Sequence, residues 1–346
     1  MIGYLELKNF RCFREQKSFQ FNSGDIVLTG PNGSGKTSLL ESLGYLSILR
    51  SFRGARSREL TTLGEHGFEL SCRLKNKGGR KSILKVREDL EGHRELLLGG
   101  ARPQRASDFI REFRCVAFIP EDREIVSGAS GNRRRFFDIL ISSVDGSYFK
   151  SLSDYNRALA QRNRALKSSG SDLARHFDGE LAERAPEIIS ARMKYAALIG
   201  EKVNELLKSK GSSFEIRYMG GASLDAEQNL HLLKKSFEKD KMRKCTSFGP
   251  QLDEFEFRLD GKVMRHIAST GQRGIVALML KLAEFTTFKQ ESAMPVAVLA
   301  DDVLCDLDRN NAELFLDRIK SADQRFFTFA EMPAFGNFKE FETIEL

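Results

Sequence analysis

Residues 30–37 read Gly30-Pro31-Asn32-Gly33-Ser34-Gly35-Lys36-Thr37. They match the P-loop pattern G-x-x-x-x-G-K-[ST], in which glycines let the backbone wrap around a polyphosphate in conformations that a Cβ would hinder. The exposed amides and the N-terminus of the next helix then point at phosphate oxygens. We expect Lys36 to contact the β- and γ-phosphates and the Thr37 hydroxyl to bind Mg²⁺. Residues 30–38, which include Ser38, are the expected ATP-binding residues.

The segments on either side of the loop support this interpretation. Residues 25–29 read DIVLT, a short apolar run that predicts a buried strand. Residues 38–43 then open a helix. Strand, loop and helix in this order are the context that the motif requires, which disfavours a chance glycine-rich turn.

Composition indicates a globular chain with a polyanionic partner. With 346 residues, 41% of them hydrophobic, the chain is long enough for one large domain or two lobes. Lysine and arginine exceed aspartate and glutamate by 55 − 48 = 7, with a pI near 9.1. A basic balance suits nucleic acid, although +7 is a mild bias at this size.

Cysteine and histidine usage argues against a disulfide framework or a zinc site. The chain has five cysteines, an odd number with no C-x-x-C pair, and five scattered histidines. The N-terminus alternates too early for a signal peptide, and no apolar run approaches the ~20 residues needed to span a bilayer. We expect a reduced, cytoplasmic, soluble protein.

The first third of the chain is predicted to be β-rich apart from the P-loop helix. Alternating or apolar runs predict strands, and the turn residues Asn76-Lys77-Gly78-Gly79 predict a hairpin between two of them. The expected strands are 4–8, 19–21, 68–74, 82–86, 95–98 and 115–119.

Residues 130–210 are predicted to form a helical lobe. Apolar residues keep helical spacing there, with a loop at 168–171 and a second helical stretch that starts near Pro186. The lobe is too short for a long coiled coil. Beyond it we expect a strand at 214–218, a charged helix at 225–244, and a hairpin at 255–264 that turns at Asp260-Gly261.

A second motif is Ser269-Thr270-Gly271-Gln272, directly before a helix whose apolar stripe includes Ile275 and Leu278. A serine and a glycine at a helix start leave a hydroxyl and amides available to bind an anion. An ordinary helix N-cap at Ser269 is the alternative.

A third motif is the apolar run 295–300 ending in Asp301 and Asp302, a Walker B pattern. We expect Asp301 in the Mg²⁺ shell and Asp302 as the catalytic carboxylate that orients or deprotonates the attacking water, alongside Lys36. Asp308 lies in the following turn, where it either orders a dimer interface or caps a helix.

The order of these motifs predicts an ABC-type ATPase head. The expected fold is α/β, with a mixed or parallel core sheet, an antiparallel β subdomain and an inserted helical lobe. Residues 1–120 and 290–346 would form lobe I, and residues 121–289 the mostly helical lobe II. In such heads the signature at 269–272 acts in trans on the γ-phosphate of a second copy, so ATP holds a homodimer together.

Several arginines are candidates for contacts with phosphate or DNA. The loop at 50–58 is rich in arginine and includes Arg53, although a solvated basic loop would read the same way. Arg11 could reach the bound nucleotide or be a surface residue. Arg133, Arg134 and Arg135 could contact DNA or cover a helix face.

Over nearly its full length the chain resembles the RecF family, bacterial DNA replication and repair proteins. The motifs that carry this resemblance are Asn9-Phe10-Arg11, the P-loop, Ser51-Phe52-Arg53, Phe118-x-Pro120-Glu121-Asp122, Arg133-Arg134-x-Phe136-x-Asp138, Gln161-Arg162-Asn163, Thr246-x-x-Gly249-Pro250, Ser269-x-Gly271-Gln272, Leu282-Ala283-Glu284 and Asp301-Asp302-Val303-Leu304-x-x-Leu307-Asp308.

The chain departs from the family pattern at three places. Gln251-Leu252-Asp253 stands where the family usually has His-Arg-Asp, and Thr328-Phe329-Ala330-Glu331 replaces a Thr-Thr-rich turn. Ala300 replaces a bulkier apolar residue, which should matter little. The second departure lies near the γ-phosphate in related heads, so nucleotide sensing or turnover could differ.

The resemblance implies an ATP-dependent protein of DNA repair, replication restart and the SOS response to DNA damage. Such proteins use ATP and Mg²⁺, dimerise on ATP, bind duplex or gapped DNA, and hydrolyse ATP slowly. With RecO and RecR they help to place RecA on single-strand gaps. Three alternatives stay open: a clamp without turnover, a transporter ATPase subunit, and a repair ATPase of the structural-maintenance group. The signature motif does not have the form found in transporter ATPases, which disfavours a transporter subunit. The missing coiled coil disfavours a repair ATPase of the structural-maintenance group.

Overall fold

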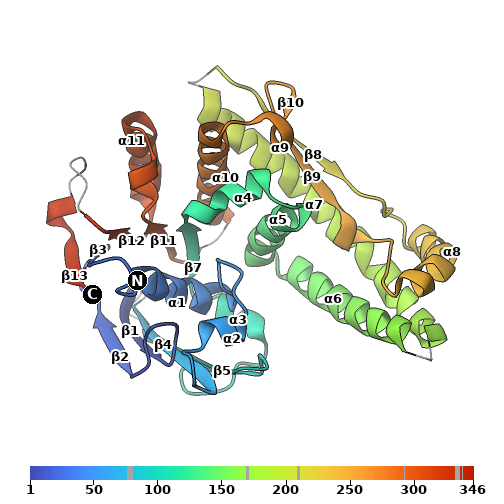
Figure 1. The fold of residues 1–346 in the computed structure, drawn as a ribbon, viewed down its shortest axis with the longest axis horizontal. Coiled ribbons are helices and arrows are strands. Elements are labelled where there is room, and N and C mark those ends of the chain that lie inside the picture. Colours follow the sequence, from blue (N-terminus) through green and yellow to red (C-terminus); the bar gives the residue numbers. More distant parts are fainter. Residues whose placement is uncertain (76–80, 169–170, 209–210, 292, 332–335, 337) are drawn as a thin grey trace. The chain divides into compact units, whose positions relative to one another are not determined.

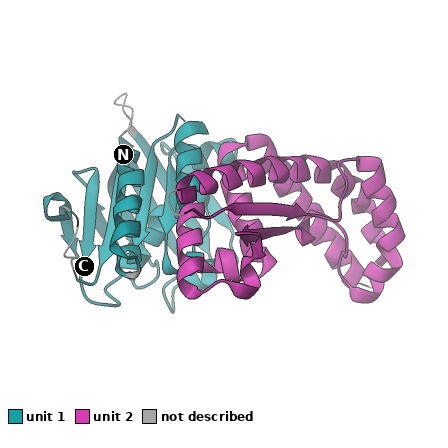
Figure 2. Cartoon of the chain, turned by 90° about the horizontal axis from the view of Figure 1, so that it is seen from above, with its two compact units in different colours: residues 1–122, 281–346 teal, residues 123–280 magenta. Residues whose placement is uncertain are grey.

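The protein forms two compact units in a computed structural model that describes residues 1–75, 81–168, 171–208, 211–291, 293–331, 336 and 338–346. Unit 1 contains residues 1–122 and 281–346, and unit 2 contains residues 123–280 (Figure 2). The sequence placed the lobe boundaries at 120/121 and 289/290. Both the predicted second boundary and the observed one, between residues 280 and 281, fall inside the long helix α10 (Thr270–Glu291). Composition therefore gave no signal for the point where the units divide.

Unit 1 is built on a parallel five-stranded sheet with the order β13-β3-β12-β11-β7 (Figure 1). Every neighbouring pair in this sheet is parallel. Strands β7 and β11 are buried along their whole length, as expected of parallel strands that are covered on both faces. The strands are β3 (Asp25–Thr29), β7 (Arg114–Phe118), β11 (Val296–Asp301), β12 (Gln324–Phe329) and β13 (Glu342–Glu345).

An antiparallel sheet with the order β2-β1-β4-β5-β6 completes unit 1. Side chains of β4 alternate between buried positions and half-buried or exposed ones, so this sheet has one face in the core and one face towards solvent. The predicted strands of this region are confirmed, whereas the predicted turn at 76–79 lies outside the described residues. The strands are β1 (Ile2–Lys8), β2 (Lys17–Gln20), β4 (Gly67–Lys75), β5 (Lys81–Asp89) and β6 (Arg94–Leu98).

Helix α1 (Lys36–Ile48) packs against both sheets, which explains why it is buried almost all round (Figure 1). Gly44 is required on the side that faces Phe52. A Cβ at this position would lie 2.6 Å from the Phe52 ring. The P-loop helix is therefore fixed in the centre of unit 1 by close packing on opposite faces.

The remaining helices of unit 1 are short. Phe315 of α11 packs edge-on against Phe118 of β7, with ring centroids 4.8 Å apart. The helices are α2 (Ser57–Leu60), α3 (Ala106–Ile110) and α11 (Arg309–Arg318), and the 3₁₀ turns are Pro120–Asp122, Val303–Asp306, Ile319–Ser321 and Phe338–Glu340.

Unit 2 is mainly helical and carries a small antiparallel sheet with the order β10-β9-β8. The predicted hairpin is confirmed, and Asp260 and Gly261 adopt φ values of 50° and 77° in its turn. The elements are α4 (Arg123–Ser127), α5 (Ser130–Val144), α6 (Gly146–Lys167), α7 (Asp178–Leu207), β8 (Phe214–Met219), α8 (Ala226–Arg243), β9 (Glu254–Leu259), β10 (Lys262–Val263) and α9 (Met264–Ile267), with 3₁₀ turns at Ser171–Phe177 and Pro250–Leu252.

The predicted start of α7 near Pro186 is wrong, because the helix begins at Asp178. Proline favours the first turn of a helix, which suggested a start there. The residues before it, Leu181, Ala182 and Ala185, are all buried. Their burial outweighs the loss of one backbone hydrogen bond at the proline.

Arg162 connects three elements of unit 2 through a buried ion-pair network. Its side chain is fully buried. Nε donates to Asp178 at 2.8 Å, and one terminal nitrogen donates to Asp240 of α8 and to Thr246, both at 2.8 Å. The paired charges thereby tie α6 to the start of α7 and the end of α8.

Among the described helices, none is long and apolar enough to cross a membrane.

Arg162→Met should destabilise unit 2 strongly. It leaves two buried aspartates without their cation, which costs about 3–5 kcal/mol in comparable cases. Chemical denaturation followed by circular dichroism measures the effect. Arg157→Met is the matched control, because Arg157 is 63% exposed and pairs with Asp154 on the same helix. That change should stay within about 0.5 kcal/mol of the wild type, and an equal loss in both variants would contradict the role of the network.

Candidate nucleotide-binding site

The loop before α1 has the backbone geometry of a phosphate cradle. Gly33 and Gly35 adopt positive φ values of 86° and 108°. A Cβ at Gly35 would lie 2.8 Å from the Phe13 ring and 2.9 Å from the sulfur of Cys12. Glycine is therefore needed here both for the conformation and for the close approach of the turn after β1.

Lys36 lies back across this loop. Its side chain is 5% exposed, and Nζ donates to the carbonyl oxygens of Gly30 at 2.7 Å and Pro31 at 3.0 Å. The ammonium is thus held over the concave side of the loop. A polyphosphate bound there would offer it charged acceptors in place of these neutral ones.

The end of β11 comes together with the start of α1 and the end of β12. The Thr37 hydroxyl donates to Oδ1 of Asp301 at 3.0 Å, and the Thr328 hydroxyl donates to the same oxygen at 2.8 Å. These oxygens are the ligand types that Mg²⁺ prefers. Thr37 and Asp301, predicted as metal ligands, are therefore placed where they could hold the ion jointly.

Burial raises the pKa of Asp301 above its usual value. Hydrogen bonds from Thr328 and Thr37 oppose the shift, and the charges of Asp302 and Glu121 add to it. A carboxylate that is costly to ionise gains from a divalent cation, because the cation supplies the missing positive charge. The electrostatic environment of Asp301 beside Asp302 thus fits a metal site.

Asp302 follows in a left-handed conformation, with φ of 51°. Its backbone N–H donates to the Thr328 hydroxyl at 2.9 Å. Thr328 therefore orients both aspartates of the Walker B pair. The sequence did not predict this role, although the parallel register that pairs Asp301 with Thr328 follows once β11 and β12 are neighbours.

Asp308 is the N-cap of α11. Its Oδ1 accepts from the backbone N–H of Asn311 at 2.9 Å. The structure thus gives it the local role that the sequence held open as the alternative. A role at a dimer interface stays a prediction.

The signature residues lie at the N-terminus of α10, in unit 2. The Ser269 hydroxyl accepts from the Gln272 N–H at 3.2 Å, and the Gln272 side chain accepts from the Ser269 N–H at 2.9 Å. This reciprocal pair is a capping box. Ser269, Thr270, Gly271 and Gln272 are all exposed, so a capped but accessible helix start is available.

Arg11 is engaged inside unit 1. Its guanidinium donates two hydrogen bonds to Glu41 of α1, at 2.7 and 2.9 Å, and one to the Glu59 carbonyl at 2.9 Å. Glu41 is fully buried and also accepts from the Ser51 hydroxyl. These bonds make Arg11 a structural arginine in this state, and its predicted phosphate contact stays a prediction.

The other predicted arginine contacts also have partners in the structure. Arg53 pairs with Glu121 at 2.8 Å, and both side chains are about half exposed. Arg133 is 3% exposed and donates two bonds to Glu254, at 2.7 and 2.9 Å. Arg134 donates to the Asp253 carbonyl at 2.6 Å, and Arg135 is half-buried on α5. For Arg133 and Arg134 this favours packing over a contact with DNA.

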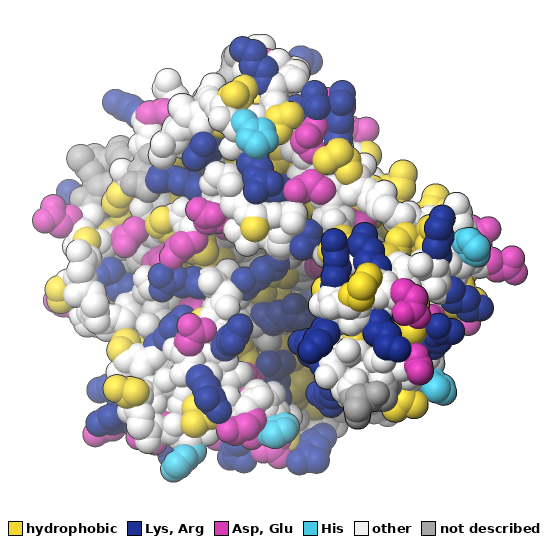
Figure 3. Space-filling view, turned by 45° about the vertical axis from the view of Figure 1, so that its right-hand side comes forward, with side chains coloured by type: hydrophobic (Ala, Val, Ile, Leu, Met, Phe, Trp, Pro, Cys, Tyr) yellow, Lys and Arg dark blue, Asp and Glu magenta, His cyan; other side chains and the backbone are white. Residues whose placement is uncertain are grey.

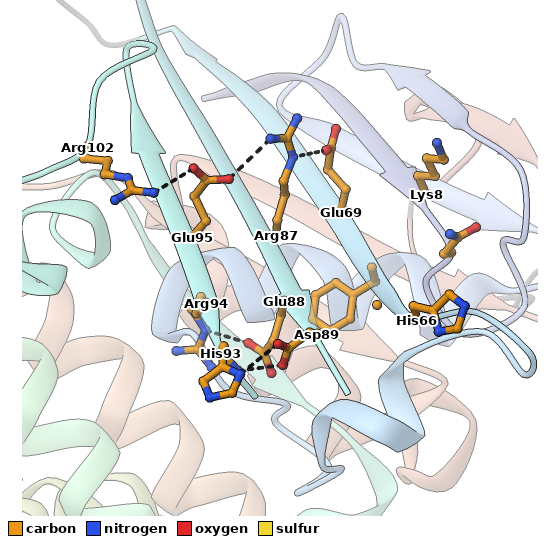
Figure 4. Close-up of a pocket in the computed structure, with 13 residues that line it drawn as sticks. Lys8, His66, Glu69, Arg87, Glu88, Asp89, His93, Arg94, Glu95 and Arg102 are labelled. Carbon is orange, nitrogen blue, oxygen red and sulfur yellow. Dashed lines mark hydrogen bonds and ion pairs between the residues drawn. The ribbon is translucent and has the colours of Figure 1, made fainter. Parts of the chain in front are cut away.

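A shallow pocket of about 580 Å³ lies on the outer face of the antiparallel sheet and contains none of the predicted site residues (Figure 4). Its charged side chains neutralise one another across the strands. Arg87 bonds both Glu69 and Glu95, and Arg102 bonds Glu95. We therefore interpret it as a solvated ion-pair ladder and not as a ligand site.

Comparison with known proteins places the chain among DNA repair ATPases. The sequence model of the RecF/RecN/SMC N terminal domain matches residues 1–332. The chain is 32% identical to the DNA replication and repair protein RecF of Clostridium novyi over 92% of its own length and 90% of that protein. It is 29% identical to the RecF protein of Carboxydothermus hydrogenoformans over 99% and 98% of the two chains.

Solved structures agree with the sequence comparison. The recombination mediator protein RecF of the RecFOR pathway, solved with ATP, superposes with a TM-score of 0.86 at 28% identity, over 97% of this chain and 93% of that one. An Smc head domain from Pyrococcus furiosus gives a TM-score of 0.52 at 17% identity, over 95% and 89% of the two chains, and thus shares the fold.

Thr328→Val should weaken Mg²⁺-dependent nucleotide binding. It removes the bond that orients Asp301 and leaves the Asp302 N–H without its acceptor. Loss of such a supporting partner typically costs 10- to 100-fold in metal affinity. Titration of Mg²⁺ at fixed nucleotide, read by calorimetry, measures the change. Thr343→Val is the matched control, because Thr343 is an exposed residue of β13, and this variant should bind like wild type. Equal affinities for all three proteins would show that Thr328 does not orient the pair.

Asp301→Asn should raise the melting temperature of the nucleotide-free protein at neutral pH. A carboxyl whose folded-state pKa is raised stabilises the fold at low pH and loses this contribution as pH rises. Asparagine removes that penalty, so the gain should be absent below about pH 4 and grow towards pH 7. Thermal melts across this range test it. A variant less stable than wild type at pH 7 would overturn the electrostatic assignment.

Proposed function

The chain belongs to the RecF family of DNA replication and repair proteins, and from that premise we propose that it is an ATP-dependent, DNA-binding recombination mediator. In this proposal ATP closes a homodimer over duplex DNA near single-strand gaps, and the closed dimer helps to load RecA. The observation that carries it is the junction of Thr37, Asp301 and Thr328 beside the P-loop lysine.

That junction supports the nucleotide half of the proposal. Lys36 and the loop amides would hold the β- and γ-phosphates, and Thr37 with Asp301 would hold Mg²⁺. The metal, when bound, would offset the charge that develops on the transferred phosphoryl group. Asp302, whose backbone is fixed by Thr328, would orient the attacking water or accept its proton.

The signature supports dimerisation on ATP. The first turn of a helix leaves backbone N–H groups without intrahelical partners, and its dipole favours an anion. In unit 2 this turn carries Ser269 to Gln272 and is exposed. We propose that it meets the γ-phosphate held by a second copy, so that each nucleotide is bound by two chains.

The proposed partners follow from the family. RecR and RecO would act with the dimer at gapped DNA, as expected of a component of the RecFOR pathway. The net charge of +7 is compatible with binding to a polyanion.

Turnover is expected to be slow, because Asp302 is one methylene shorter than the glutamate common at this position in ABC-type heads and would hold water less closely. This feature also favours a second candidate, an ATP-gated clamp with no turnover at all.

ATPase assays on wild type and Asp302→Asn, with and without duplex DNA, separate the candidates. We expect a wild-type rate below about 1 s⁻¹, the lower end for enzymes, that rises with duplex DNA. The variant should lose at least about 10²-fold, the usual contribution of a general base. Turnover that is fast and indifferent to DNA would contradict the mediator proposal, and equal rates in both proteins would remove Asp302 from the chemistry.

Lys36→Ala should abolish ATP-driven dimerisation measured by light scattering, because the phosphates lose their main cation. Lys320→Ala serves as control, since Lys320 is exposed and pairs with Asp317 on a neighbouring turn. A dimer that persists in Lys36→Ala and without ATP would show that nucleotide does not hold the copies together.

A further inference from the structure

The C-terminal half of α8 carries a dense cluster of basic residues. Residues 234–244 contain six lysines and arginines, namely Lys234, Lys235, Lys239, Lys241, Arg243 and Lys244, against two acidic residues. All six basic side chains are exposed. Figure 3 brings this end of the unit forward, and blue side chains gather there.

One of the two acids is neutralised inside the unit. Asp240 is fully buried, where it accepts from Arg162 at 2.8 Å and from the backbone N–H of Ser247 at 2.9 Å. Its charge therefore does not offset the lysines outside. Glu238 is the remaining exposed acid, and it lies 3.9 Å from Arg175.

Most of the exposed cations lack a carboxylate partner in the described part of the chain. Lys241 lies 3.6 Å from Asp172, a distance typical of a loose surface pair. Among the ion pairs found between described residues, none involves Lys234, Lys235, Lys239, Arg243 or Lys244. The surface thus presents uncompensated charge.

Three of these cations form a line. Lys235, Lys239 and Arg243 are spaced four residues apart, which places them on one face of α8 in steps of roughly 6 Å. The opposite face is anchored, because Leu233 and Phe237 are buried and Arg175 stacks over the Phe237 ring at 4.1 Å. The line is therefore held on a rigid support.

The helix dipole explains the positions of only some of these basic residues. Cations in the last turn interact favourably with the C-terminal end of the helix dipole, which explains Lys241 and Arg243. Lys234, Lys235 and Lys239 lie earlier in the helix, outside the last turn where that interaction acts. The mutual repulsion of these three lysines destabilises the free protein, and a bound polyanion would relieve it.

We propose that this face of α8, defined by Lys235, Lys239 and Arg243, binds the phosphate backbone of duplex DNA. The inference rests on the proposed function and adds to it the surface that holds the DNA. A row of separated cations matches a row of phosphates better than it matches a single small anion, which needs convergent donors. Lysine and arginine contacts to backbone phosphates position a duplex without reading its sequence.

The test compares the salt dependence of duplex binding in two triple variants. K235Q/K239Q/R243Q removes the line, and K150Q/K194Q/K208Q removes three exposed lysines elsewhere in unit 2. Glutamine has a helix propensity close to that of lysine, so both should fold. Fluorescence anisotropy of a labelled duplex, with ATP, gives log K against log[salt] between about 50 and 200 mM.

Each backbone contact contributes about 0.9 to the slope, so the α8 variant should lose about 2.7 for each chain that contacts the duplex, or about 5.4 for a closed dimer. The control should keep the wild-type slope. ATP-driven dimerisation should be unchanged in both. If the α8 variant does not fold, Lys239→Gln alone should lose about 0.9 for each chain that contacts the duplex.

Three outcomes would overturn the proposal. A wild-type slope in the α8 variant removes α8 from the DNA contact and leaves the mediator function intact. Failure of the wild type to bind duplex at any ATP concentration overturns both. Loss of binding to RecR or RecO, with an unchanged DNA slope, would make the surface a protein-docking site.

Discussion

A buried carboxylate, Glu41, ties the nucleotide-binding unit together. It lies on α1 without contact with water, and it is stabilised by two hydrogen bonds from Arg11 and one from the Ser51 hydroxyl. A buried charge that lost these partners would cost several kcal/mol. The turn after β1, the P-loop helix and the loop after it must therefore keep their mutual positions. Ser51 in turn accepts from the backbone N–H groups of Arg53 and Ala55, at 3.0 and 3.1 Å, which fixes the arginine-rich loop.

The sequence predicted the elements that local chemistry specifies. The P-loop requires glycine at defined positions, and an apolar strand that ends in two aspartates is a recognisable pattern. The sequence alone therefore predicts Lys36, Thr37 and Asp301 as site residues, and the structure brings Thr37 and Asp301 together. Strands β1 to β7 and β11 of unit 1 could be predicted because their alternation or apolar runs are strong, whereas the short strand β13 was not predicted. The start of α7 could not be predicted correctly from Pro186, because the residues before the proline are buried by the tertiary fold, and tertiary context overrides local helix signals.

Side-chain partners were harder to predict than elements. The sequence predicts Arg11, Arg133 and Arg134 as candidates for contacts with phosphate or DNA, because the planar guanidinium group matches the geometry of phosphate. In the fold they meet Glu41, Glu254 and the Asp253 carbonyl instead. In the sequence Thr328 stands out only as part of a departure from the family pattern, yet its hydroxyl bonds the Asp301 carboxylate and the Asp302 backbone N–H. Such roles depend on which strand ends are neighbours, and that follows from topology and not from spacing along the chain.

Several motifs of unit 2 that resemble the RecF family serve packing. Asn163 accepts from both the N–H and the hydroxyl of Thr246 at 2.8 Å, so two distant motifs meet in one contact. Arg192 joins Asp138 to the Pro250 carbonyl, at 2.8 and 2.7 Å. Charged residues that make these contacts have their partners inside the unit and are not available to bind a ligand at its surface. Surface chemistry then depends on residues outside these motifs, such as the exposed basic residues of α8.

The capping box at Ser269 and Gln272 occupies two backbone N–H groups at the start of α10. Because the two side chains already satisfy the backbone N–H groups of Ser269 and Gln272, a dissolved phosphate or sulfate ion can use these two donors only if it displaces the intramolecular pair. An intramolecular competitor acts at high effective concentration, which dissolved ions at ordinary levels do not match. A γ-phosphate held on the P-loop of a docked copy would arrive with a comparable advantage of proximity. The resting helix start would thus behave as a filter that ignores the salts of the surrounding solution and responds to a phosphate that another protein chain presents.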